Sequence, residues 1–128
     1  MGAEIHISNL EYRHDTTPEQ VNTELRRETI KTLSGEWLIS LDTETIKNGI
    51  PHFFPVIQND RDPKTHQLAA HAIFGLITVL GSLNIDHEEY NNLGKEAMKH
   101  LYFSKDRMEH AGEILTRLEN IFGTYKPL

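Results

Sequence analysis

The chain has 128 residues, of which 38% are hydrophobic, and its 19 acidic side chains outnumber the 13 basic ones to give a net charge of −6. This length fits one domain with one hydrophobic core, so we expect residues 1–128 to form a single domain. The lack of cysteine excludes disulfides, thiolate metal sites and cysteine nucleophiles, and it favours a cytoplasmic location. No basic stripe points to a nucleic-acid partner, and no apolar run is long enough to span a membrane.

The N-terminal part begins with a pattern that is typical of a strand and continues with one that is typical of a helix. Residues 3–12 alternate between apolar and polar side chains, which predicts a β-strand. Thr17 and Pro18 then give a helix-start signal, a hydroxyl cap followed by proline in the first turn. Because only a thin apolar stripe follows, we expect a surface helix over residues 18–33.

Residues 36–57 are compatible with two structures. The apolar side chains that follow Trp37 alternate with polar ones, and Asn48-Gly49 is a strong two-residue signal for a β-hairpin. The alternative is a helix that ends at Gly49. β-branched threonines favour the hairpin, whose second strand would lie at a sheet edge because it contains two prolines.

The C-terminal half predicts three helices that run antiparallel to one another. Asp62, with Pro63 after it, and Asp86 are N-cap signals, and Ser104 supplies a hydroxyl that can cap the last helix. The first of these helices is apolar on nearly every face, so we expect it to be the buried central helix. The expected helices cover residues 64–80, 87–102 and 105–122.

These elements together predict a mostly helical α+β fold. In it, a small antiparallel N-terminal sheet with one surface helix packs on an antiparallel three-helix C-terminal layer. The side chains that we expect to be buried in this layer are Leu68, Ile73, Leu76, Leu80, Leu93, Leu101, Leu115 and Leu118.

The search for catalytic motifs yields one cluster, which could bind a metal. Matching the levels of the three C-terminal helices through their short turns places His71, Glu96, His100 and His110 side by side, and such a set suits zinc or another first-row divalent metal. Eight histidines in the chain make such coincidences common, however, and the ligands have no evident partners to orient them. We therefore expect no metal and no cofactor, and we expect His71 to be a buried structural histidine.

Two groups of residues are candidates for contact with a partner. The first is aromatic and comes from the ambiguous stretch, and the second widens the apolar stripe of the last helix. Either group could instead pack in the core, but exposed apolar patches often mark interaction sites, and a symmetric homodimer is the commonest way to cover one. The candidates are Trp37, His52, Phe53, Phe54, Ile114 and Ile121.

The sequence thus predicts a small acidic protein-binding module without catalytic activity, acting as a regulator, inhibitor or adaptor. Its expected partner is another protein, and a homodimer is a further expectation. The alternative is a metal- or ligand-binding enzyme that uses the His/Glu cluster in the C-terminal helices.

Overall fold

The computed structural model describes residues 7–11 and 23–127, and within these ranges it contains helices and no strand. The predicted N-terminal sheet is absent from the described part of the chain, so the α+β class is wrong and the fold is all-helical. The elements are η1 (Ser8–Leu10), α2 (Thr23–Ser40), α3 (Thr43–Gly49), η3 (Ile50–Phe53), α4 (Phe54–Asn59), α5 (Pro63–Gly81), α6 (His87–Ser104) and α7 (Glu109–Phe122).

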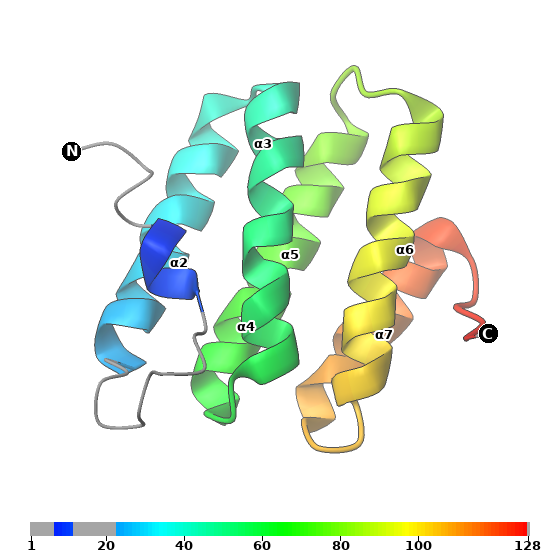
Figure 1. The fold of residues 1–128 in the computed structure, drawn as a ribbon. Helices are drawn as coiled ribbons and strands as arrows, with labels where there is room; N and C mark the ends of the chain where they lie inside the picture. Colours follow the sequence, from blue (N-terminus) through cyan, green and yellow to red (C-terminus); the bar gives the residue numbers. More distant parts are fainter. Residues whose placement is uncertain (1–6, 12–22, 128) are drawn as a thin grey trace.

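The helices form two layers (Figure 1). α3, η3 and α4 follow one another as a single helical rod, and this rod and α6 lie in front of α2, α5 and α7. The rod contacts both α2 and α5, while α6 contacts both α5 and α7. Each front element therefore occupies the groove between two helices of the back layer.

The central position of α5 follows from its sequence. It contacts α2, the α3–η3–α4 rod, α6 and α7, as expected of a helix that is apolar on nearly every face. Of the eight side chains expected in the core, Leu68 and Leu93 are half-buried and the other six are buried. The three C-terminal helices are thus confirmed, with ends that differ by a few residues from those predicted.

The predicted hairpin is wrong because the stretch after residue 36 buries its side chains with the spacing of a helix. α2 continues to Ser40, and its buried residues include Ile30, Leu33 and Trp37, which lie three and four positions apart and share one face. Ile39 and Leu41, which the strand pattern paired with Trp37, are 83% and 63% exposed. The alternation of apolar residues was therefore accidental.

Gly49 lies inside a continuous helical rod, and a close contact explains the glycine there. Its dihedral angles are φ −77° and ψ −40°, which is right-handed helical backbone. A Cβ atom at this position would lie 2.6 Å from Cε3 of Trp37. The two prolines that follow stand in the first turns of η3 and α4, where a missing N–H group is tolerated because a new helical segment begins there.

Aspartate side chains begin three of the helices. Asp42 and Asp62 each accept a hydrogen bond from the backbone N–H of the threonine three positions on, at 2.9 Å in both cases. Asp86 accepts one from the N–H of Glu89 at 3.1 Å, which confirms the predicted caps at 62 and 86. The predicted cap at Ser104 is wrong, because Ser104 belongs to α6 and its hydroxyl donates to the carbonyls of His100 and Leu101.

The predicted N-terminal elements fall only partly within the described residues. The strand expected over residues 3–12 is replaced, where it is described, by the short 3-10 helix η1. The helix start at Thr17 and Pro18 lies outside the described residues. The surface helix expected over residues 18–33 corresponds to α2, which reaches seven residues further.

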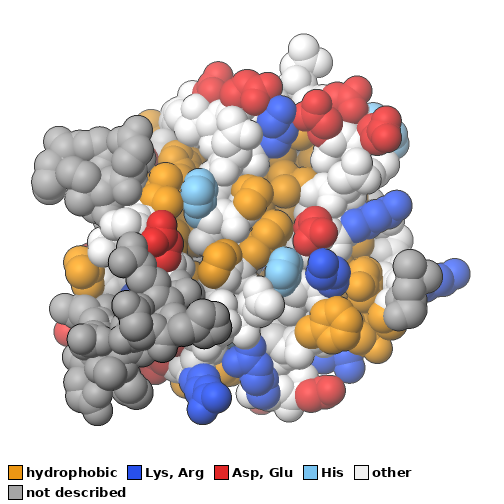
Figure 2. All heavy atoms as spheres, in the orientation of Figure 1, with side chains coloured by type: hydrophobic (Ala, Val, Ile, Leu, Met, Phe, Trp, Pro, Cys, Tyr) orange, Lys and Arg blue, Asp and Glu red, His pale blue; other side chains and the backbone are white. Residues whose placement is uncertain are grey.

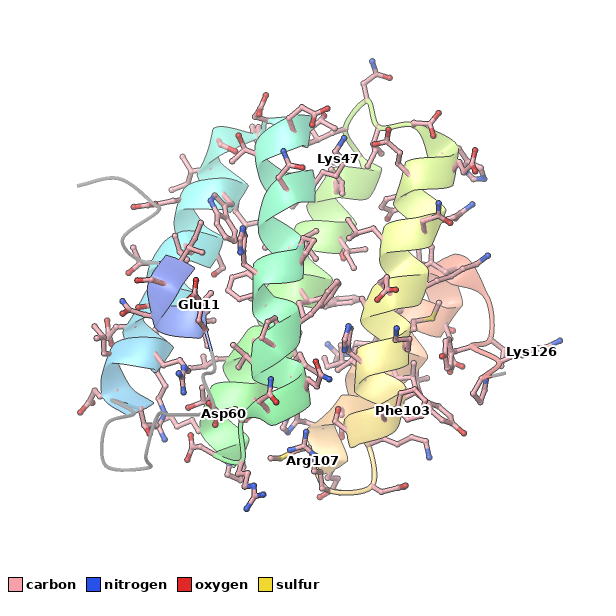
Figure 3. The ribbon with its side chains drawn as sticks, viewed as in Figure 1. Glu11, Lys47, Asp60, Phe103, Arg107 and Lys126 are labelled. Atoms are coloured by element: carbon pink, nitrogen blue, oxygen red, sulfur yellow. The ribbon has the colours of Figure 1, made fainter. Side chains whose placement is uncertain are left out.

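A buried polar cluster joins η1, α2 and the end of α4. The Arg26 guanidinium donates to the backbone carbonyls of Asn9 and Glu11 at 3.0 and 3.1 Å and lies 3.5 Å from the Asp60 carboxylate. Buried charges require partners of this kind. At the opposite end of the molecule, Lys47 donates to Glu89 at 2.9 Å and so links α3 to α6 (Figure 3). None of the described helices is long and apolar enough to cross a membrane.

Candidate functional site

The last turns of α6 carry an aromatic side chain on the charged face of the helix. α6 buries Gly94, Ala97, Met98, Leu101 and Ser104. The opposite face presents Asn92, Lys95, Glu96, Lys99 and Phe103, all exposed. Phe103 is 69% exposed, and its ring lies edge-on to the ring of its neighbour Tyr102, so burial in the core does not account for an aromatic residue there.

Two clefts flank Phe103, and both are also lined by Lys99. One has a volume of about 550 Å³, and its other lining residues are Asn92, Lys95, Glu96, Tyr125 and Lys126. The other has a volume of about 420 Å³, and its other lining residues are Gln58, His100, Ser104 and Arg107. We refer to the residues of both clefts together as the Phe103 surface. Figure 3 shows Phe103 and Lys126 projecting on the same side of α6.

The chain after α7 forms one wall of the larger cleft. Gly123 has a φ of 95°, in the range that favours glycine. The backbone N–H of Tyr125 then donates to the Glu119 carboxylate at 2.9 Å, and the Tyr125 ring packs on Tyr102 with the ring centroids 5.3 Å apart. These contacts hold the segment that carries Lys126 against α6.

The Phe103 surface is positively charged although the chain as a whole is acidic. Lys95, Lys99, Arg107 and Lys126 line the clefts together with a single carboxylate, that of Glu96. Glu96 lies 3.6 Å from the Lys99 ammonium, whereas within the described part of the chain Lys95 and Lys126 make no ion pair. In Figure 2, lysine and arginine side chains gather over the lower and right-hand parts of the view, with a few acidic ones among them, and acidic side chains gather along the upper edge.

Arg107 and His100 complete the smaller cleft. The Arg107 guanidinium donates to the backbone carbonyls of Ile57, Gln58 and Asp60 at 3.0, 2.9 and 3.1 Å, so its charge is not neutralised by these partners. His100 stacks on Phe54 with the ring centroids 4.7 Å apart. Burial lowers the pKa of His100, although the Glu96 carboxylate opposes this effect. The imidazole is therefore a neutral, flat wall at neutral pH.

The residues predicted to contact a partner have different environments in the structure. Trp37, Phe53, Phe54 and Ile114 are buried, as in the core-packing interpretation of these residues. His52 is exposed beside the Trp37 ring, and Ile121 is 43% exposed.

The four residues of the predicted metal cluster separate into pairs. Glu96 and His100 lie 3.5 Å apart on α6, where His100 faces α4. His71 is exposed on α5 rather than buried, and it lies near His110 of α7, whose pKa is lowered by burial and by His71. Among residues 7–11 and 23–127, no three histidine, aspartate or glutamate side chains are grouped so that they could hold a metal ion.

His66, which was not among the residues predicted from the sequence, is fully buried and forms a hydrogen-bonded pair with the half-buried His110. Nε2 of His66 lies 3.1 Å from the Ile57 carbonyl, which can only accept, so this nitrogen carries the proton. In neutral His66, Nδ1 then accepts from Nε2 of His110. Burial lowers the pKa of His66 to about 4, and the charges of His110 and Arg107 add to this effect. The His66–His110 hydrogen bond thus joins α5 to α7, which is a structural role.

His66 and Phe103 were not predicted as site residues, although each has a recognisable position in the sequence pattern. His66 lies seven residues before Ile73, which is the spacing of the buried face of α5, whereas His71 does not fit this spacing. Phe103 follows Lys95 and Lys99 at intervals of four on the charged face of α6. The helix predicted from the sequence ended at residue 102, so Phe103 was not among the predicted site residues.

Comparison with known proteins gives no match to a family model, to a curated protein or to a solved structure. The function is therefore inferred from the chemistry of the surface itself.

Proposed function

We propose that this protein is a protein-binding module without catalytic activity, a regulator, inhibitor or adaptor, and that it contacts its partner through the Phe103 surface. The observation that supports the proposal is the 69% exposure of Phe103 between two clefts. Exposed aromatic residues that become buried at the centre of a protein interface contribute a large share of the binding energy. Here the aromatic side chain stands on a helix, so little conformational entropy is lost on binding.

A second exposed apolar site lies at the junction of α2 and α3 and is the main rival of the Phe103 surface. It consists of Ile39 and Leu41, and Leu41 has a φ of 49°, a strained value for a residue with a side chain. Figure 1 places this junction at the opposite end of the molecule from the end of α6. The two surfaces can therefore be tested separately.

Photo-crosslinking in the cells that make the protein tests the proposal. Benzoylphenylalanine replaces Phe103 in one variant and Asn120, which is exposed on α7, in a control variant. We expect irradiation to join the first variant, but not the second, to one discrete protein. A product of twice the chain mass would identify the partner as a second copy. No product at position 103, or the same products at both positions, would refute the proposal.

A further inference from the structure

We infer that the Phe103 surface binds an acidic peptide segment that carries one large apolar side chain. This inference rests on the proposed function and adds the chemistry of the partner. The apolar side chain would lie in the larger cleft against the Phe103 and Tyr125 rings, and carboxylates beside it would contact Lys95, Lys99 and Lys126.

The charges around the larger cleft support an anionic ligand. Lys95 and Lys126 make no ion pair within the described part of the chain, and Glu96 is the only carboxylate that lines the cleft with them. All three lysines line one cleft, so a ligand in it lies within the screening length of about 8 Å at physiological salt. Complementary charge of this kind raises the association rate and selects among partners.

The charge of the whole molecule favours a short acidic segment over a nucleic acid. A single-stranded nucleic acid needs a continuous basic track and several aromatic rings on which its bases stack. Here one exposed phenylalanine stands among a few lysines, while the chain carries a net charge of −6. The exposed carboxylates at the starts of α3 and α6, including Asp42, Glu44 and Glu88, would repel a long polyanion.

Fluorescence anisotropy with four labelled 12-residue peptides tests the inference on the intact chain. Two of the peptides are acidic, one with a single leucine and one without it. The other two carry the same leucine in a neutral or a basic sequence. Labelled dT12 is the nucleic-acid probe. We expect the acidic leucine peptide to bind most tightly and to lose affinity as the salt concentration rises. The inference would be overturned by tighter binding of dT12 or of the neutral peptide, or by no binding of the acidic leucine peptide at millimolar concentration.

Charge-reversal variants locate the binding site. Lys95→Glu with Lys126→Glu should weaken binding of the acidic leucine peptide by about tenfold or more. Lys31→Glu with Lys64→Glu changes the net charge equally at exposed positions on α2 and α5, and we expect a change of less than about twofold because attraction at a distance is screened. Equal losses in the two pairs would mean that the peptide responds only to net charge.

The two proposals fail in different ways. A cross-linked partner at position 103 together with no acidic-peptide binding would contradict the acidic ligand and leave the protein-binding function in place. Acidic-peptide binding that persists in Lys95→Glu with Lys126→Glu would place the peptide on another surface and would also contradict the inference.

Discussion

A single close contact explains the glycine at position 49, since its backbone conformation is open to any residue. The ring of Trp37 covers the position where a side chain would begin, and both residues are buried in the packing of α2 against α3. Gly75 offers a contrast, because it also lies inside a helix but a Cβ atom there would meet nothing within 4 Å. The two glycines have similar backbone conformations, but only at Gly49 does a neighbouring side chain exclude a Cβ atom.

Replacing each glycine by alanine tests this difference, because the two changes should alter stability in opposite directions. Gly49→Ala should lower the free energy of unfolding by roughly 1–3 kcal/mol, because the Trp37 ring must move from its packed position. Gly75→Ala should raise it by roughly 0.4–1 kcal/mol, because alanine reduces the entropy of the unfolded chain. Urea denaturation followed by circular dichroism measures both, and a stable Gly49→Ala protein would show that the Trp37 contact has room for a methyl group.

The last segment of the α3–η3–α4 rod, α4, depends on contacts from other parts of the fold. It has six residues, too few for a stable isolated helix. Arg107, in the loop before α7, donates to the carbonyls of Ile57 and Gln58 in α4 and of Asp60 directly after it. The Ile57 carbonyl also accepts from His66. Figure 3 shows Arg107 and Asp60 at this lower end of the molecule.

Removing the guanidinium should therefore destabilise the end of α4. We expect Arg107→Ala to cost roughly 1.5–3 kcal/mol, the usual contribution of hydrogen bonds from a charged group. Arg107→Lys should recover only part of this, because an ammonium group lacks the planar fork of donors. Amide hydrogen exchange should be faster at residues 56–60 in both variants, and unchanged exchange there would show that Arg107 does not hold α4.

The sequence predicted the C-terminal helices well because their signals are local. The caps at Asp62 and Asp86 and the apolar run of α5 each lie within a few turns of the chain. The region from Trp37 to Phe54 was predicted wrongly because its structure depends on distant contacts. An Asn-Gly pair favours a hairpin by itself, whereas here the glycine is needed by a tryptophan twelve residues earlier.

The proposed interaction surface was less predictable than the fold. The prediction of an apolar edge on the hairpin of α6 and α7 selected Ile114, which α7 buries. The surface that stands out in the structure lies on the same hairpin but on its charged face. Its larger cleft is formed where the segment after Gly123 packs along α6. No local sequence pattern predicts where that segment lies.

The stability of the whole molecule should depend on pH through its buried histidines. The pKa of His66 is about 4 in the folded protein and 6.5 ordinarily, so between these values the unfolded chain binds a proton that the folded chain excludes. Stability is then complete above about pH 7 and falls as the pH is lowered through this window. His100 and His110 act in the same direction, because burial also lowers the pKa of each.

Urea denaturation at pH 7.5 and pH 5 measures this effect. We expect a loss of about 2 kcal/mol at pH 5 from His66 alone. His66→Gln should reduce the difference between the two pH values, whatever its stability at pH 7.5. If His66→Gln keeps the full pH dependence, other groups must bind the protons.

If the Phe103 surface is where the molecule meets its partner, as we propose, the affinity for that partner depends on Phe103. The most direct test is the dissociation constant of the partner recovered by cross-linking, measured by calorimetry for the original chain, Phe103→Ala and Ile39→Ala. Both replaced side chains are exposed, so neither change should alter stability by more than about 0.5 kcal/mol. We predict that Phe103→Ala weakens binding by about 30-fold or more and that Ile39→Ala changes it by less than about twofold. Affinity lost in Ile39→Ala and kept in Phe103→Ala would show that the partner binds at the junction of α2 and α3 and not at the Phe103 surface.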